Sequence, residues 1–409
     1  MNMKIKVNRI LLTWVWIFAT CAQLFYMLYY ATGNSILVAT MATFSEVLVI
    51  VASVVLILLL KSKKRVKFDP FLRIAVIGVG FFPIVSAIYN HQEISISLVL
   101  QPTLWVMLFS VFYYATLYYG ELPLKKFWVR FSYYAILLFS VPLIFLHLTG
   151  KDPVGGIIFR VYGCLTIIPL VLYCTDFRKR YIPILLTLFV TLITLKRAGI
   201  VAAVAGLAVF YLTDGRVKAS IKSRLMRVAK LALMAIVIGT VAIFALQAIG
   251  INVIQRFREL ATDGGSGRTF IWATVYNAFT NSTTSQHFLG HGIDAVSRTV
   301  TIYVDTSIGA HNDFIEILFD YGYVGILFFF CFWYALGAEW KKQFKQHTET
   351  LAIYSYAMII TVMFMMFSYY FIDSSIINFM AIYWGVVFAE RKTRNRSVKN
   401  ELRENSSEV

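Results

Sequence analysis

The chain has 409 residues, of which 59% are apolar and only 14% are charged, whereas soluble globular domains carry about 25% charged residues. With a mean hydropathy of +0.71, this composition excludes an ordinary soluble domain and predicts a membrane protein. The net charge of +17 does not indicate nucleic acid, because most Lys and Arg residues form short clusters between apolar stretches. There they orient membrane spans and face anionic lipids.

Apolar stretches of membrane length recur along the whole chain and predict about twelve transmembrane helices. We therefore expect an all-α polytopic membrane protein that forms a single integral membrane domain over residues 1–409. The basic N-terminus precedes a long apolar run without an obvious cleavage site, so the first span is expected to be retained. The predicted spans are 10–30, 35–60, 73–90, 94–119, 131–149, 161–175, 181–195, 198–213, 231–250, 314–338, 351–372 and 375–390.

The basic residues also predict the orientation. With the N-terminus in the cytoplasm, all but eight of the 38 Lys and Arg residues fall in cytoplasmic segments, as the positive-inside rule requires. Both termini are therefore expected in the cytoplasm, including a polar tail over residues 391–409 that we expect to be disordered. The eight basic residues left outside are Lys151, Arg160, Lys196, Arg197, Arg256, Arg258, Arg268 and Arg298.

One large loop is predicted on the outer face, over residues 251–313. Apolar residues at helical spacing predict a helix in INVIQRFREL (251–260) and an interfacial helix in RTFIWATVYNAF (268–279). The loop leads into a membrane helix whose first turn Asp313 and Glu316 are expected to cap. A long loop with its own secondary structure is usually functional.

Three of the outer arginines are candidates for a phosphate site. Arg160 and Arg197 lie at the outer ends of predicted spans, and Arg268 follows a glycine-rich turn. The planar guanidinium fork binds phosphate oxygens in pairs, so these three groups would suit a pyrophosphate at headgroup depth. The alternatives are a lipid-phosphate contact, a surface ion pair or, for Arg197, snorkelling from a helix end.

His311 stands at the outer N-terminal end of a predicted membrane helix. The partial positive charge there disfavours the imidazolium form, so a neutral His311 could act as a general base. The alternative is an interfacial histidine with a backbone partner. His287 and His291 are four residues apart, but Gly290 and Gly292 argue against a helical metal pair. No metal site is predicted.

Four motifs stand out: TLKRAG at 194–199, SGRTFIW at 266–272, FLGHGID at 288–294 and HNDFIEILFDYGYVG at 311–325. Together they resemble the O-antigen polymerase and ligase superfamily. The resemblance is strongest over residues 194–325, and the predicted spans extend it to the whole chain. It implies a GT-C-like, metal-independent glycosyltransferase of the bacterial inner membrane with a periplasmic active site. Lys196 departs from the family pattern, in which a serine usually precedes the arginine.

The resemblance also implies a donor and roles for the candidate residues. The donor is expected to be an undecaprenyl-pyrophosphate-linked oligosaccharide, held by Arg197, Arg268 and, on a looser match, Arg160, while His311 activates the acceptor. We expect a polymerase that joins such units into O-antigen or a related surface polysaccharide. The alternatives are an O-antigen ligase that transfers the glycan to lipid A-core, and an exopolysaccharide polymerase. No cofactor is expected; the expected partners are the donor, membrane lipids, a flippase and a chain-length regulator, without nucleic acid.

A polysaccharide or lipid transporter is the alternative of a different class. It would need charged or broken helices at mid-membrane depth. The predicted spans hold little charge beyond Glu46, Glu316 and Asp320, and the last two lie near an outer end. Glu46 is a functional candidate whose partner and role the sequence does not give. Because the informative polar groups gather at the outer face, the sequence favours chemistry at the surface over passage through the bilayer.

Overall fold

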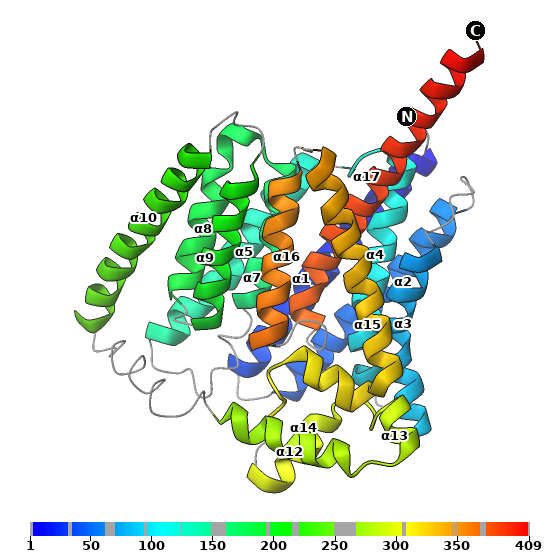
Figure 1. The fold of residues 1–409 in the computed structure, drawn as a ribbon, viewed down its shortest axis with the longest axis vertical. Coiled ribbons are helices and arrows are strands. Elements are labelled where there is room, and N and C mark those ends of the chain that lie inside the picture. Colours follow the sequence, from blue (N-terminus) through cyan, green and yellow to red (C-terminus); the bar gives the residue numbers. More distant parts are fainter. Residues whose placement is uncertain are drawn as a thin grey trace.

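The computed structural model is helical in every element that it describes (Figure 1). The helices are α1 (Met3–Ala31), α2 (Ile36–Lys61), α3 (Pro70–Tyr89), α4 (Ile96–Tyr119), α5 (Lys125–Leu148), α7 (Val161–Cys174), the short 3-10 helix η1 (Phe177–Lys179), α8 (Tyr181–Ile193), α9 (Arg197–Thr213), α10 (Ile221–Ala248), α12 (Arg268–Thr280), α13 (Thr284–Leu289), α14 (Ala295–Val304), α15 (Asp313–Gln346), α16 (Leu351–Phe367) and α17 (Ser374–Ser407). The structure describes residues 3–31, 35–61, 70–93, 96–123, 125–148, 161–193, 197–214, 221–248, 267–304, 308–346, 348, 350–368 and 374–407.

Each predicted span overlaps one of these helices. Within the described ranges, three helices are long and apolar enough to cross a membrane, namely Ile36–Leu60, Leu72–Tyr89 and Asp313–Gln346. The helical membrane class is therefore confirmed, whereas the count of twelve crossings and the GT-C-like architecture stay predictions. Four shorter apolar segments accompany the long helices: Arg9–Phe25, Tyr162–Cys174, Ala198–Thr213 and Leu351–Phe367.

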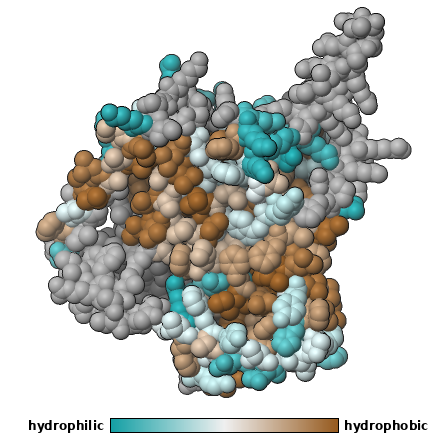
Figure 2. All heavy atoms as spheres, viewed as in Figure 1, coloured by the Kyte–Doolittle hydropathy of each residue, from teal (hydrophilic) through white to brown (hydrophobic). Residues whose placement is uncertain are grey.

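The long helices stand side by side in one bundle (Figure 1). Both chain ends lie at one end of this bundle, and α12, α13 and α14 form a layer across the opposite end, which we call the α12–α14 layer. Hydrophobic side chains cover the middle of the visible face, whereas hydrophilic ones gather toward the two ends (Figure 2). This banding is what a bundle surrounded by lipid tails and bounded by water requires.

The expectation of a disordered tail is wrong, because α17 continues to Ser407. The segment ERKTRNRSVKNELREN contains neither glycine nor proline, and most of its residues favour helix. Nothing in the local sequence stops the helix where its apolar part ends, and continuing a helix is easier than starting one.

Aromatic side chains fill the centre of the bundle. Trp16 of α1 is fully buried and meets Phe112, Trp128 and Phe379 edge-on, at centroid distances of 6.5, 4.8 and 5.4 Å. These rings come from α4, α5 and α17, so one cluster joins four helices. Such contacts contribute packing energy, which a bundle in lipid needs because lipid tails are as apolar as its side chains.

The helix α15 is broken at Gly322, which has φ 64° and ψ −163°. The segment before the break, residues 313–321, turns out of the bundle and into contact with the α12–α14 layer (Figure 1). A side chain at Gly322 would meet backbone oxygens of His287 and Phe288 at 2.6 Å. Glycine is required here both for the left-handed backbone and for the close approach of another chain segment.

The glycine-rich turn FLGHGID docks onto this break. A Cβ added at Gly290 would lie 2.1 Å from the carbonyl oxygen of Asp320. The amides of His291 and Gly292 donate to the carbonyl oxygens of Phe319 and Asp320, at 3.1 and 3.0 Å. The paired glycines therefore let two backbones meet directly, which explains their spacing.

The end of α3 holds the same turn from the other side. Ser86 Oγ lies 2.6 Å from the Leu289 carbonyl oxygen and 3.0 Å from that of Asp320, and Asn90 Nδ2 donates to the Gly290 carbonyl at 3.0 Å. Polar side chains of a membrane helix thus contact two carbonyls at the end of α13 and one at the break in α15.

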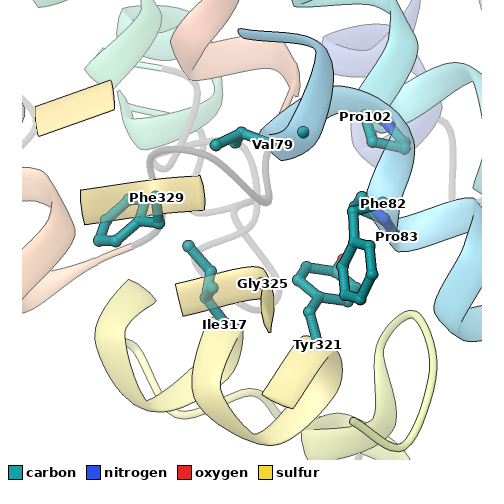
Figure 3. Close-up of a pocket in the computed structure, with 9 residues that line it drawn as sticks. Val79, Phe82, Pro83, Pro102, Ile317, Tyr321, Gly325 and Phe329 are labelled. Atoms are coloured by element: carbon teal, nitrogen blue, oxygen red, sulfur yellow. The ribbon is translucent and has the colours of Figure 1, made fainter. Parts of the chain in front are cut away.

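A cavity of about 20 Å³ lies beside the break (Figure 3). It has room for one water molecule at most, so it is a consequence of the kinked backbone and too small for a substrate. Its lining residues are Gly78, Val79, Phe82 and Pro83 of α3, Pro102 of α4, and Ile317, Tyr321, Gly325 and Phe329 of α15.

Candidate functional site

The predicted site residues lie at helix starts. Arg197 is the first residue of α9, Arg268 is the first residue of α12, and His311 stands two residues before α15. Arg160 and the Arg197 side chain lie outside what the structure describes. The prediction that these side chains converge on one site stays a prediction. The structure shows only where the helix starts at Arg197, Arg268 and Asp313 lie.

Tyr162, the second residue of α7, connects these helix ends. Its phenol lies next to the Ser368 hydroxyl at the end of α16 and within electrostatic range of Arg268 on α12. Its ring also contacts the start of α9, because a Cβ built on Gly199 would lie 3.3 Å from the Tyr162 Cε1. The N-termini of α7 and α9 therefore lie beside the C-terminus of α16, with Arg268 of α12 within electrostatic range.

The start of α15 joins the same place through Asn312. Its Oδ1 accepts hydrogen bonds from the amides of Phe314 and Ile315 at 3.0 and 3.3 Å, and its Nδ2 donates to the Met366 carbonyl of α16 at 3.4 Å. Asn312 is therefore the N-cap, and the prediction that Asp313 and Glu316 cap this helix is wrong by one position. Asp313 is instead fully buried.

Both polar groups of the Ala310 backbone are held by side chains. Its amide donates to the Glu316 carboxylate, and its carbonyl oxygen accepts a 2.8 Å hydrogen bond from Trp272 Nε1. The next residue, His311, has φ 52°, a left-handed conformation that is uncommon outside glycine. We call this arrangement the Ala310 clamp; it fixes the backbone that carries the His311 ring.

The clamp also relates His311 to Arg268. Trp272 follows Arg268 by four residues in α12, so the two side chains lie on the same face of the helix, one turn apart. The face of α12 that presents Arg268 is thus the face whose indole is bound next to His311.

The electrostatic environment of Arg268 suits an anion. Gly267, the N-cap of α12, has φ 73° and has no side chain with which to cap the helix. The helices α7, α9, α12 and α15 all begin here, and each N-terminus carries partial positive charge and unpaired amides. Within the described ranges, no group accepts a hydrogen bond from the buried Nε of Arg268.

Two buried acids of α15 hold backbone amides of the segments around the candidate site. Glu316 and Asp320 are 2% and 0% exposed, and each accepts from a backbone amide: Glu316 from Ala310, and Asp320 Oδ1 from Val296 at 2.9 Å. Because Val296 lies in the first turn of α14, Asp320 fixes the start of that helix. These acids therefore have structural partners that the sequence alone did not indicate.

His287 and His291 have structural partners as well. His287 lies 2.7 Å from the Phe279 carbonyl through Nε2, and His291 contacts the Phe319 carbonyl at 3.0 Å and Ser282 Oγ at 2.9 Å. Burial lowers the pKa of His291, although its hydrogen bond to Phe319 acts in the opposite direction. In the described part of the chain no three His, Cys, Asp or Glu side chains lie close enough to hold a metal ion.

Sequence reasoning missed Tyr162 and the Ala310 clamp. Trp272 could have been found, because it stands one helical turn after Arg268. Tyr162 could not, because a tyrosine near the end of an apolar stretch is ordinary in a membrane protein, and its importance comes from four segments that are distant in the sequence.

Residues 182–330 match a family model described as O-Antigen ligase. The matched segment runs from α8 to the middle of α15 and includes Arg197, Arg268, the Ala310 clamp and His311. No curated protein matches the chain.

Proposed function

From the match of residues 182–330 to a family model described as O-Antigen ligase, we propose that the chain is a member of the O-antigen polymerase and ligase superfamily and that it transfers a glycan from a polyprenyl-pyrophosphate donor to an acceptor hydroxyl. The observation that carries this proposal is the meeting of four helix N-termini with Arg268, next to the backbone clamp that holds His311. An activity of the O-antigen ligase or polymerase type is what the family supports. The donor, the residue roles and the independence from metal belong to the proposal.

In the proposed reaction the pyrophosphate of the donor lies against Arg268, Arg197 and, on its less specific motif, Arg160. The bond between the anomeric carbon and the pyrophosphate oxygen breaks, and the leaving group gains negative charge. Fixed guanidinium groups and helix N-termini stabilise that charge without reorganisation. Because these groups perform the neutralisation, the reaction needs no metal ion.

His311 is the proposed general base. It takes the proton of the acceptor hydroxyl while the hydroxyl oxygen forms a bond to the anomeric carbon, with inversion at that carbon. Neutral imidazole is the form that can accept a proton. The Ala310 clamp has the role of keeping the imidazole at the reacting atoms, because proton transfer requires hydrogen-bond distance.

We propose that the α12–α14 layer faces the periplasm and both termini face the cytoplasm. The support is twofold: the two chain ends share one end of the bundle (Figure 1), and most basic residues of the sequence fall on that side under the positive-inside rule. The donor would then reach the site from the outer leaflet of the inner membrane, with a flippase and a chain-length regulator as its functional partners.

The finer proposal is a polymerase that extends a lipid-linked chain, because the segment HNDFIEILFDYGYVG is polymerase-like in sequence. The second candidate is a ligase that transfers the finished glycan to lipid A-core, which the description of the matched family favours. The surface polysaccharide of a deletion strain separates the two. Loss of a polymerase leaves single repeat units on the acceptor, whereas loss of a ligase leaves polymer on the lipid carrier.

The residue roles are tested by returning variants to that strain at equal protein level. His311→Ala and Arg268→Ala are expected to abolish the polymer. His91→Ala is the matched histidine control, because His91 has φ 51° and is exposed. Arg178→Ala is the arginine control, because Arg178 lies in η1 at the opposite end of the bundle and is exposed. Normal polymer from both site variants would refute the assigned roles.

A further inference from the structure

We propose that an apolar groove between α12 and the first part of α15 binds the first isoprenoid units of the donor, next to its pyrophosphate. The identity of the ligand rests on the proposed function, whereas the groove itself is a feature of the structure. Its volume is about 230 Å³. The lining residues are Trp272, Val275, Tyr276 and Phe279 of α12 and Ile315, Leu318 and Phe319 of α15.

The register of α12 connects the groove with the phosphate site. Arg268, Trp272, Val275 and Phe279 are spaced by four, three and four residues, so they form one stripe along the helix. The stripe starts with a cation at the helix N-terminus and continues as apolar surface for about 10 Å, at 1.5 Å per residue. A molecule with a diphosphate head and a hydrocarbon chain matches this sequence of charge and apolar surface.

The chemistry of the lining favours a hydrocarbon chain over a sugar. No lining side chain is charged, and the only hydroxyl belongs to Tyr276, which is 69% exposed and stands at the rim. A glycan site needs several convergent hydrogen-bonding groups, because a sugar left without them loses its bonds to water. Branched aliphatic and aromatic walls instead bind an isoprenoid chain by removing apolar surface from water.

The position of the groove suits a ligand that enters from a bilayer. The α12–α14 layer exposes other large apolar side chains, among them Phe270 at 50% and Ile302 at 79%. Exposed apolar residues that gather on a layer across one end of a membrane bundle indicate contact with the lipid interface. A polyprenyl chain could therefore reach the groove from the hydrocarbon region without crossing water.

Trp272 belongs to both the groove and the Ala310 clamp. The ring that would contact the first isoprenoid unit therefore also holds the backbone next to His311. The same side chain would therefore position both the lipid and the proposed base. The groove would contribute affinity for the donor and would also fix the donor's anomeric carbon relative to His311.

Kinetics with two donors of different chain length test the groove. Leu318→Glu places a charge in the groove at a half-buried position, and Ile302→Glu places the same charge on an exposed side chain of the same layer outside the groove. With intact protein in lipid nanodiscs, Leu318→Glu should raise the KM for a long-chain polyprenyl-diphosphate glycan by about tenfold, which corresponds to losing fewer than two buried methylene groups. The KM for an ethyl-diphosphate glycan, which has no isoprenoid unit to fill the groove, should rise less than that for the long donor, and Ile302→Glu should change neither.

An unchanged KM for the long donor, or an equal rise for both donors, would overturn the proposal. Labelling without turnover provides a second measurement, using a long-chain polyprenyl diphosphate without sugar that carries a diazirine close to the diphosphate. Label is expected on residues 272–279 and 315–319, reduced by Leu318→Glu but not by Ile302→Glu. Labelling outside residues 272–279 and 315–319, or equal labelling of these residues by a phosphatidylglycerol that carries a diazirine, would mean that the groove does not bind the donor. This conclusion would hold even if the protein transfers glycan. Labelling as expected from a protein that transfers no glycan would refute the proposed function and retain the groove.

Discussion

The Ala310 clamp makes the sharpest prediction, and Trp272→Phe is the substitution that tests it. Phenylalanine keeps an aromatic ring against Val275 and Phe319 but lacks the indole Nε1–H that donates to the Ala310 carbonyl at 2.8 Å. One partly buried hydrogen bond is lost, which is expected to lower the free energy of unfolding by about 1 kcal/mol. The fold should therefore survive, so that a change in activity can be attributed to geometry.

The expected effect on catalysis is larger than the effect on stability. With its carbonyl released, one of the two hydrogen bonds of the clamp remains, from the Ala310 amide to Glu316, and His311 can shift while keeping its left-handed backbone. A displacement of the order of 1 Å at a reacting group costs up to about 10²-fold in rate. We expect kcat to fall by between about tenfold and a hundredfold while the donor KM changes by less than about threefold, because the pyrophosphate groups are untouched.

The assay is glycan transfer by the purified full-length enzyme in nanodiscs, with thermal unfolding of the same samples. Trp340→Phe is the matched control: it removes the 2.9 Å hydrogen bond from Trp340 Nε1 to Ser355 Oγ, which lies near the other end of α15. It should lower stability by a similar amount and leave kcat unchanged. If Trp272→Phe has the same kcat as Trp340→Phe, the clamp does not position His311 and the reasoning fails.

Four further predictions follow from the same contacts. Arg268→Lys keeps the charge but loses the planar fork, so the donor KM should rise about tenfold; an unchanged KM in the transfer assay would contradict a pyrophosphate contact. Glu316→Leu leaves the buried Ala310 amide without its acceptor and should cost about 1–3 kcal/mol in unfolding experiments, whereas Glu316→Gln, which keeps an acceptor, should retain most of kcat. Gly290→Ala adds a Cβ 2.1 Å from a backbone oxygen of α15, whereas Gly120→Ala, also at positive φ, meets nothing within 4 Å; the first should destabilise by more than about 2 kcal/mol beyond the second, as measured by thermal unfolding. Burial lowers the pKa of His291, so His291 binds a proton more readily when the α12–α14 layer is unfolded than when it is folded. Protection of this layer against hydrogen exchange should therefore fall as the pH drops below about 6.5. Protection that does not change with pH would contradict a contribution of His291 to the stability of the layer.

Most helices could be predicted from the sequence because lipid requires long apolar runs with internally bonded backbones. The run 73–90, for example, became α3 over Pro70–Tyr89. The break in α15 could not be predicted, because the apolar pattern continues through Gly322. It depends on the docking of the glycine-rich turn near residue 290, more than thirty residues earlier, and sequence spacing gives no such contact.

Only those residues of the candidate site that occur in family-like motifs could be predicted from the sequence. Arg268 and His311 could be identified because their motifs resemble those of a known superfamily. The partners that fix them could not, because each partnership joins different helices. Tyr162 connects α7 with α9, α12 and α16, and Glu316 holds a backbone amide instead of capping the helix on which it lies.

The buried acids of α15 have structural partners of their own, next to a site that is proposed to bind an anion. Glu316 and Asp320 lie four residues apart, on one face of the helix, and both are bonded to backbone amides. The amides are partly positive, so each carboxylate acts mainly on the turn that it organises. Arg268 and the starts of α7, α9 and α12 come from other segments and meet around Tyr162. The two acids are thus used to build the loop, and the cationic groups are left for the ligand, which is the division that the proposed catalysis by fixed dipoles and guanidinium groups requires.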